Sequence, residues 1–344
     1  MAIEIIATGR AIPPRRVTND DLAARIDTTD EWIRSHTGIG ARHIAEADVA
    51  ASDLALEAAN NALSLAIERG AVTEKSIEEL ALTIDLIVLG TTTQDYYGCP
   101  ATACIVQDKL GAYNAGAMDI TVACSSFVYG LEAAAGLLTV SPERKRALVI
   151  GAETLSRIAD WNDRSICVLF GDGAGAVLIE KTGAPAVGPG RRGLVRSVLG
   201  ADGSGAQALI VRRGGGRNPL SAGEILDRAP GIEMDGQAVY RFAVAAVTGT
   251  IEKLLLYEGI TISDIDRIVP HQANARIVQA AGKRLGINEE KFYLNIEEYA
   301  NTSSASIPIA LDELNRAEKL RRGDVVMTVG FGAGLTYGGN LIIW

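Results

Sequence analysis

The sequence predicts an α/β protein in which one structural unit occurs twice, and three observations lead to this prediction. Short apolar strands alternate with helical patterns in the first half of the chain, which is typical of a largely parallel, buried sheet. The second half repeats the same order of strands and helices. A stretch rich in Gly and Pro, "TGAPAVGPGRRG" at 182–193, follows the last strand of the first half. We therefore expect two halves, 1–181 and 182–344.

Apolar runs predict the strands of the first half in chain order. They are "IEIIATG" at 3–9, "DLIVLGTT" at 85–92, "AMDITVA" at 117–123, "RALVIGAE" at 146–153 and "GAGAVLIEK" at 173–181. Helical patterns lie between several of them, notably at 52–68 and 124–138. This alternation favours parallel strands whose sheet is covered by helices.

Matched segments support the internal repeat. "DLIVLG" at 85–90 is similar to "DRIVPH" at 266–271, and "RALVIGAE" is similar to "GDVVMTVGFGAG" at 323–334. Helical segments match in the same order, 52–68 with 236–257 and 105–112 with 277–287. Short apolar strands can resemble one another by chance, but here order and spacing match as well as composition. Two such copies would pack sheet to sheet around shared helices.

The composition limits the classes of function. The formal net charge is −9, which argues against a general nucleic-acid binder but leaves room for a local basic patch. The N-terminus does not read as a signal peptide, and no stretch of about 18 uncharged apolar residues predicts a membrane span. The spacing of the four cysteines fits neither a CxxC pair nor a zinc site (Cys99, Cys104, Cys124 and Cys167). We therefore expect a reduced, cytoplasmic protein with no metal site.

Cys124 follows an apolar strand and begins a helix, in "DITVACSSFVYGLEAAAGLL" at 119–138. A helix N-terminus presents unpaired N–H groups and a partial positive charge. Both favour a thiolate, so a cysteine at this position can have a lowered pKa and act as a nucleophile. Considered alone, such a cysteine is more often a small buried hydrophobic residue.

His271 and Asn301 are two further candidates. His271, one of three histidines, ends a strand in "IVPHQANARIV" at 268–278, and ligands of α/β folds collect at the carboxyl ends of strands. A strand-end histidine satisfied by backbone groups is an equally good interpretation. Asn301 stands in "EYANTSSASIPIAL" at 298–311, just before a helix, where helix capping is the more common role of an asparagine.

Two Gly-rich stretches stand near these candidates, "FGDGAGAVLI" at 170–179 and "GFGAGLTYGG" at 330–339. The first leads into a strand and lacks the G-x-G-x-x-G spacing, which argues against a dinucleotide-binding loop. Closely packed backbone, or a backbone N–H offered to a ligand, is the better interpretation.

Taken together, these pieces resemble β-ketoacyl-acyl-carrier-protein synthase III of the thiolase superfamily. The motifs that carry the likeness span nearly the whole chain, and they are "IIATGRAIPPRRVTNDDL", "DTTDEWIRSHTGIGARHIA", "ACSSFVYGL", "FGDGAGAVL", "VPHQAN", "NTSSASIPIALDE" and "GFGAGLTYG". The resemblance implies a duplicated, five-layer αβαβα fold of the thiolase type and a homodimer. It also implies a Cys–His–Asn triad, which falls here on Cys124, His271 and Asn301.

The resemblance further implies residues that bind the substrates. An oxyanion hole would be formed by the backbone N–H groups of Cys124 and Ala333. A coenzyme A site maps onto Thr28, Trp32, His36 and Arg164. Two of these, the planar side chains of Trp32 and Arg164, would stack on adenine. The carrier-protein contact maps onto Gln272, Ala273, Asn274, Ala275 and Arg276.

Cys99 maps onto the residue that helps to close the partner subunit's acyl pocket in this family. It stands in the loop "TTTQDYYGCPATAC", where acetyl-specific relatives have Phe. Cys is smaller than Phe, so we expect a deeper pocket that accepts branched or longer acyl-CoA primers. Tyr96 or Tyr97, in the same loop, could instead fill the space.

The implied reaction is a decarboxylative Claisen condensation of an acyl-CoA primer with malonyl-acyl carrier protein, which initiates fatty acid biosynthesis. Cys124 would take the acyl group, and neutral His271 and the Asn301 amide would stabilise the enolate left by loss of CO₂. The scheme needs no cofactor or metal, because acyl-CoA is a substrate. An acidic carrier protein would dock on a helix face that carries Arg276 and Lys283, unless this is an ordinary solvated face.

Four positions depart from the family pattern. His36 stands where Arg is common, Ser126 and Ala300 stand where Gly is usual, and Ala333 stands within the last Gly cluster. An oxyanion-hole donor is a backbone N–H, so Ala333 can still supply it. These departures keep open an alternative function, a specialised condensing enzyme similar to ketosynthase III or an acyltransferase of secondary metabolism.

Two other classes fit less well. Papain-like proteases share the order Cys, His, Asn, but their Cys precedes Trp and lies near the mature N-terminus, whereas Cys124 precedes Ser125. A non-catalytic binding protein would be expected to lose at least one member of the triad, and all three are present.

Overall fold

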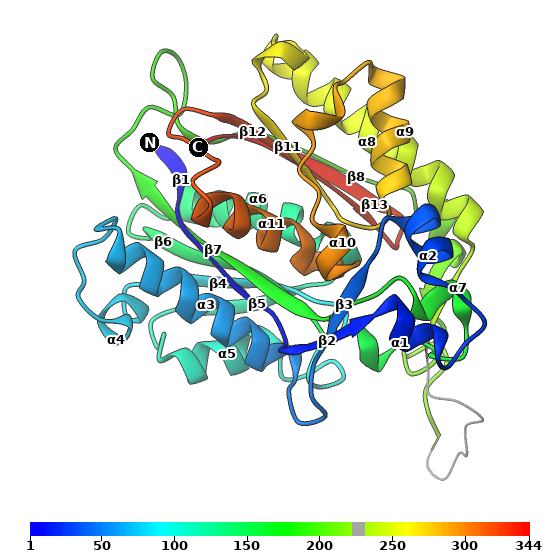
Figure 1. Ribbon diagram of the computed structural model, residues 1–344. Coiled ribbons are helices and arrows are strands. Elements are labelled where there is room, and N and C mark those ends of the chain that lie inside the picture. The colour runs from blue at the N-terminus through cyan, green and yellow to red at the C-terminus, as the bar shows by residue number, and fades with distance from the viewer. Residues whose placement is uncertain (222–230) are drawn as a thin grey trace.

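The computed structural model describes residues 1–221 and 231–344, and its N-terminal sheet has five strands in the order β1, β7, β6, β4, β5 (Figure 1). The strands are β1 (Ala2–Ala11), β4 (Leu86–Gly90), β5 (Gly116–Ile120), β6 (Arg146–Glu153) and β7 (Gly173–Thr182). β4 pairs in parallel with β5 and β6, whereas β7 pairs antiparallel with β1 and β6. The division predicted at residue 181 falls at the end of β7.

The C-terminal sheet has four strands in the order β11, β12, β13, β8. They are β8 (Gly193–Ala201), β11 (Arg267–Pro270), β12 (Val325–Gly332) and β13 (Thr336–Ile343). Their pairing, parallel and then twice antiparallel, repeats that of β4, β6, β7 and β1. The counterpart of β5 is reduced to one parallel bridge between Ile268 and Phe292. The sheets therefore repeat strand by strand.

The prediction of a largely parallel sheet is wrong, because both sheets are mixed. β12 and β13 are joined by only three residues, 333–335, and so short a connection allows only antiparallel pairing. β7 also pairs antiparallel with β6, although a longer segment, 154–172, joins them. Strands that are buried on both faces are apolar throughout, so their sequences do not reveal their direction.

Six helices form three layers around the two sheets. α6 (Ser126–Val140) and α11 (Ser306–Arg316) lie between the sheets and pack against apolar residues of both. The outer face of the N-terminal sheet is covered by α3 (Ala51–Glu68) and α5 (Thr102–Leu110). The outer face of the C-terminal sheet is covered by α8 (Gly236–Glu258) and α9 (Ala275–Leu285). This is the predicted five-layer αβαβα arrangement (Figure 1).

The central position of α6 accounts for its apolar composition. The segment Ala123–Val140 has a mean hydropathy of 1.4 and is long and apolar enough to cross a membrane, yet 61% of it is buried within the protein. Glu132 lies within the segment, so the segment is not an uncharged apolar run of the kind that predicts a membrane span. Its contacts with the two sheets explain its hydropathy without a membrane.

Shorter elements complete the fold. The helices are α1 (Asn19–Ala23), α2 (Asp30–Thr37), α4 (Ile77–Ala81), α7 (Arg164–Cys167) and α10 (Ile296–Tyr299). Two antiparallel pairs are formed by β2 (Arg15–Thr18) with β3 (Ala41–Ile44) and by β9 (Leu209–Val211) with β10 (Ile232–Met234). In Figure 1, α1, α2 and α7 gather at one end of the molecule.

Candidate active site

The two central helices are each preceded by a short 3₁₀ turn that contains a residue of positive φ. In η1 (Ala123–Ser125) this residue is Ala123, at φ 49°, and in η6 (Ser303–Ala305) it is Ser303, at φ 48°. A left-handed backbone is unfavourable for residues that carry a Cβ, and it persists where the surrounding structure enforces it. In the first turn, this bend places Cys124 at the start of α6.

Cys124 is buried, and burial raises the pKa of its thiol to about 12. A hydrogen bond with the Ser303 side chain and one with its own backbone lower the pKa, and the charge of Glu153 raises it, but these effects are smaller. The expectation of a lowered thiol pKa is therefore wrong, because desolvation outweighs the effect of the helix N-terminus. Cys124 rests as a thiol.

His271 follows β11 at the edge of the C-terminal sheet, and only 1% of its surface is exposed. Burial lowers the pKa of His271 to about 3, so the imidazole is neutral near pH 7. Its Nδ1 lies 2.7 Å from Ser306 Oγ, and its ring packs edge-on against Phe331. The bond at Nδ1 decides which ring nitrogen carries the hydrogen.

Asn301 is held by both its backbone and its side chain. Its N–H donates to Leu169 O at 2.9 Å, and its carbonyl accepts from the Gly171 N–H at 3.0 Å. Its Oδ1 accepts from the Ser303 N–H at 2.8 Å, which fixes the orientation of the amide and leaves the Nδ2 hydrogens available. The preceding Ala300 has φ 56° and ψ −154°, a region that is almost confined to glycine. The glycine that is usual at position 300 in the family would therefore adopt this backbone conformation with less strain than alanine.

Cys124 lies between two cavities. The first, of about 290 Å³, is also lined by His271 and Asn301, and its lining includes Trp32 and Arg164. The second, of about 360 Å³, is lined mainly by apolar side chains, which include Leu155, Ile158, Phe170, Leu209, Ile210, Val211 and Ile232. The thiol therefore borders a passage that also contains the imidazole and the amide, and it borders an apolar pocket as well.

Three of the residues predicted to bind coenzyme A form a stack. The ring centroids of Trp32 and His36 lie 4.5 Å apart, and Arg164 Cζ lies 4.7 Å from the Trp32 ring. Arg164 thus contacts the indole directly, and it also donates to Asp27 O at 2.9 Å. That Trp32 and Arg164 stack on adenine stays a prediction, and their direct contact means that Arg164 would have to move for a ring to enter between them. The buried Thr28 hydroxyl has no hydrogen-bond partner within the described ranges, so it is available to a ligand.

The segment predicted to contact a carrier protein is only partly accessible. The prediction is wrong for Gln272, which is 1% exposed and whose amide is occupied by backbone groups of Pro270, Tyr293 and Asn295. Ala273, Asn274 and Ala275 are half-buried. Arg276 is the exposed member of the segment.

Ala333 and Cys99 have different relations to the site. Ala333 lines the apolar cavity, and the turn that contains it lies so close to Cys124 that a Cβ on Gly332 would approach the Cys124 nitrogen to 2.7 Å. Cys99 is exposed and lines neither cavity of the single chain. Its predicted contact is with a second subunit.

Three polar residues near the triad were missed by reasoning from the sequence. Ser303 contacts Cys124, Ser306 contacts His271, and the carboxyl group of Glu153 acts on Cys124 through its charge. The serine-rich motif after Asn301 was a signal for the first two. A carboxylate that ends the apolar run "RALVIGAE" was the signal for Glu153.

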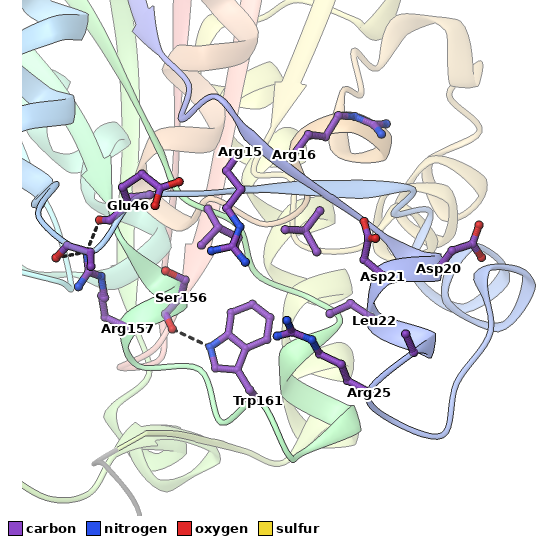
Figure 2. A pocket seen from close by; sticks show the side chains of 15 residues that line it. Arg15, Arg16, Asp20, Asp21, Leu22, Arg25, Glu46, Ser156, Arg157 and Trp161 are labelled. Carbon is purple, nitrogen blue, oxygen red and sulfur yellow. Dashed lines mark hydrogen bonds between the residues drawn. The ribbon is translucent and has the colours of Figure 1, made fainter.

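A third cavity, of about 830 Å³, shares no lining residue with the other two (Figure 2). Its charged side chains are of both signs, namely Arg15, Arg16, Arg25 and Arg157 with Asp20, Asp21 and Glu46. Trp161 lies among them and donates its indole N–H to Ser156 O at 3.0 Å. No thiol or imidazole lines this cavity, so it is not the catalytic candidate. Within 1–221 and 231–344, no group of three or more His, Cys, Asp or Glu side chains is arranged to hold a metal ion.

Comparison with known proteins gives consistent results. Family models described as 3-oxoacyl-[acyl-carrier-protein] synthase III and as its C-terminal part match residues 118–203 and 255–344. The β-ketoacyl-[acyl-carrier-protein] synthases III of Caldanaerobacter subterraneus subsp. tengcongensis and Syntrophomonas wolfei are each 44% identical to this chain, over 100% of it and 98% of theirs. The solved structure of β-ketoacyl-[acyl carrier protein] synthase III from Thermus thermophilus is 39% identical and covers 99% of each chain, with a TM-score of 0.86.

Proposed function

The chain belongs to the 3-oxoacyl-[acyl-carrier-protein] synthase III family, and on this premise we propose how its residues carry out the initiating condensation of fatty acid synthesis. The enzyme is an acyltransferase that first loads an acyl primer and then forms a carbon–carbon bond. The position of Cys124 between two cavities is the observation that supports the proposal. One cavity can hold the acyl chain. Acyl-CoA and malonyl-acyl carrier protein can reach the sulfur in turn through the other.

Acyl transfer begins with attack of the Cys124 sulfur on the thioester carbonyl of acyl-CoA. The resulting oxyanion accepts hydrogen bonds from the backbone N–H groups of Cys124 and Ala333. The carbon–sulfur bond to coenzyme A then breaks, and coenzyme A leaves as a thiol with the proton that Cys124 gives up. Because the resting thiol has a raised pKa, loss of this proton accompanies the attack rather than preceding it.

Condensation uses the donors on the other wall of the first cavity. Loss of CO₂ from the malonyl group leaves an enolate, whose oxygen accepts hydrogen bonds from His271 Nε2 and Asn301 Nδ2. Neutral His271 carries its hydrogen on Nε2 when Nδ1 accepts one from the Ser306 hydroxyl. That hydroxyl has one hydrogen and two acceptors within reach, His271 Nδ1 at 2.7 Å and Ser303 O at 2.9 Å, so this arrangement requires that the hydrogen is directed to Nδ1. The enolate carbon then attacks the acyl carbonyl, and Cys124 is released as the new carbon–carbon bond forms.

The apolar cavity is proposed to hold the primer chain. Each methylene that it buries contributes about 0.8 kcal/mol, so branched or longer acyl-CoA primers are expected to react at least as well as acetyl-CoA. Cys99 of each subunit would close the cavity of the other. Values of kcat/KM for acetyl-, isobutyryl- and octanoyl-CoA test this, and Cys99→Phe should shift preference toward acetyl-CoA. A wild-type enzyme with a strong preference for acetyl-CoA would contradict it and implicate Tyr96 or Tyr97.

A homodimer is proposed from the edge of the N-terminal sheet. β5 pairs with β4 along one edge only, and an unpaired strand edge is a template for a further strand. Pairing of β5 with β5 of a second copy would also bring each Cys99 loop toward the other subunit. Light scattering should give twice the chain mass. Gly116, and therefore Met118 two residues on, directs its N–H toward β4, so Ala117→Pro is the change that removes an N–H from the free edge of β5, and it should shift the protein toward monomer.

The remaining features of the proposal concern partners and surroundings. Acyl-CoA and malonyl-acyl carrier protein are substrates, and the scheme uses no cofactor, metal, nucleic acid or membrane. All four cysteines are free, which supports a reducing, cytoplasmic location.

The decisive experiment follows the acyl group. Incubation with acyl-CoA should add one acyl mass at Cys124, and addition of malonyl-acyl carrier protein should release CO₂ and β-ketoacyl-acyl carrier protein. Acylation of Cys99, Cys104 or Cys167 instead would contradict the assignment of the nucleophile. Acylation of Cys124 without carbon–carbon bond formation would favour the alternative, an acyltransferase of a specialised pathway.

A further inference from the structure

Glu153 is a buried carboxylic acid whose hydrogen-bond partners are all uncharged. It ends β6, and none of its surface is exposed. Burial raises the pKa of its carboxyl group. Within the described part of the chain, its contacts are with threonine and serine hydroxyls and one backbone N–H. A buried acid with no cation beside it is costly to a fold, so its presence calls for a function.

The carboxyl group of Glu153 contacts both halves of the molecule. Oε2 accepts from the Thr92 hydroxyl at 2.9 Å and the Thr93 hydroxyl at 2.8 Å, and the Thr92 N–H lies 3.1 Å away. Oε1 lies 3.2 Å from the Thr92 nitrogen and 2.8 Å from Ser304 Oγ, which also lies 2.8 Å from Gly90 O. Glu153 thus connects the segment after β4 with the turn before α11.

Each of these contacts leads to the catalytic centre. Thr92 lines the apolar cavity beside Cys124. Ser304 lies in η6, between Ser303, which binds the amide oxygen of Asn301, and Ser306, which contacts His271. Loosening Glu153 would therefore loosen one wall of the acyl cavity and the turn that supports the two proposed enolate donors.

We propose that Glu153 is a positioning residue that ties the acyl-cavity wall to the turn beside Asn301. The inference rests on the proposed function of Cys124 as the acyl carrier.

The connection is tested by two substitutions at one position. Glu153→Asp keeps the carboxyl group and shortens its reach, whereas Glu153→Gln keeps the reach. We expect Glu153→Asp to lower kcat for condensation several-fold while Cys124 acylation is retained, and Glu153→Gln to stay closer to wild type.

Ser304→Ala removes the same connection from the other half. We expect unchanged acylation of Cys124 and a several-fold lower kcat for condensation because the turn beside Asn301 is loosened. This variant also carries the test if the Asp variant does not fold, as judged by thermal unfolding.

Wild-type rates in both half-reactions for a folded Glu153→Asp variant or for Ser304→Ala would overturn the inference. Failure of the proposed function would be recognised separately, as absence of acyl transfer in the wild-type enzyme.

Discussion

The turns that open α6 and α11 have nearly the same backbone and different side chains. Ala123 and Ser303 have φ values of 49° and 48°, and each stands second in a matched run, 122–126 and 302–306. At the third position of these runs are Cys124 and Ser304. The internal repeat has therefore produced two equivalent strained turns, of which only one carries a thiol.

The comparison extends to the strands that face these turns. β6 ends in Glu153, whose carboxylate contacts Ser304 in the opposite half, and β12 ends in Gly332, whose backbone lies against Cys124. A side chain at position 332 would occupy the space beside the Cys124 N–H, where an oxyanion must bind. Backbone strain is thus common to both turns, and the side chains decide which of them is reactive.

The largest expected effect comes from making the two turns alike. Cys124→Ser places a hydroxyl at both third positions, and in the proposed scheme His271 does not act as its base, because Nε2 carries a hydrogen when Nδ1 accepts from Ser306. Acylation by acyl-CoA should fall by at least about 10³-fold. Intact-protein mass spectrometry measures the rate of acylation. A Cys124→Ser variant that is acylated at a rate near wild type would show that the thiol is not essential.

His271→Ala and Asn301→Ala separate the half-reactions. Both side chains face Cys124 from the C-terminal half, and both would stabilise a charge that arises only during decarboxylation. We expect condensation to fall by about 10²–10³-fold for each, with appreciable Cys124 acylation retained. Release of labelled CO₂ from malonyl-acyl carrier protein measures the rate of the condensation half-reaction. Equal losses in both half-reactions would contradict this division of roles.

A smaller effect is expected on the outer helices, which differ in charge between the halves. On α9, Arg276 and Lys283 are exposed and unpaired in the described structure, whereas Lys109 on α5 forms an ion pair with Asp53 at 2.7 Å. Arg276→Glu should raise KM for malonyl-acyl carrier protein roughly threefold to tenfold at low salt, because a surface attraction becomes a repulsion. Acyl-CoA kinetics should be nearly unchanged.

Lys109→Glu is the matched control for that experiment, because it reverses a charge on the corresponding helix of the other half. It should leave KM for the carrier protein as in wild type. An Arg276→Glu enzyme with the same KM as wild type would indicate that α9 presents an ordinary solvated face.

The smallest expected effect concerns strain that only the second half contains. Ala300 has φ 56°, whereas Ile120, at the corresponding distance before the first turn, is not among the residues of positive φ. Ala300→Gly should stabilise the protein by about 1 kcal/mol, measured by urea denaturation. Ala305→Gly is the control, since Ala305 is buried with ordinary φ, and it should destabilise. A destabilised Ala300→Gly protein would contradict the strain argument.

Local patterns in the sequence predicted much of this molecule. The helices at 52–68 and 236–257 correspond to α3 and α8, and each main strand expected in the first half is present, although β5 ends at Ile120. The repeat was visible because it preserves spacing along the chain. Cys124, His271 and Asn301 were found because each stands at the junction of two predicted elements.

Properties that depend on distant contacts could not be predicted. Glu153 and Ser304 are 151 positions apart, and nothing in either local sequence records their contact. Burial of Gln272 and the high pKa of Cys124 likewise depend on how the two halves pack. Electrostatic expectations from a helix terminus alone fail when desolvation is larger.

The junction at Cys124 has a kinetic consequence. Because coenzyme A and the carrier-linked malonyl group must both reach the sulfur through the cavity that His271 and Asn301 line, only one of them can occupy it at a time. The first product must depart before the second substrate enters, which dictates a ping-pong order. Double-reciprocal plots should be parallel, and free coenzyme A should compete with malonyl-acyl carrier protein, because the two share one entrance to the acylated enzyme.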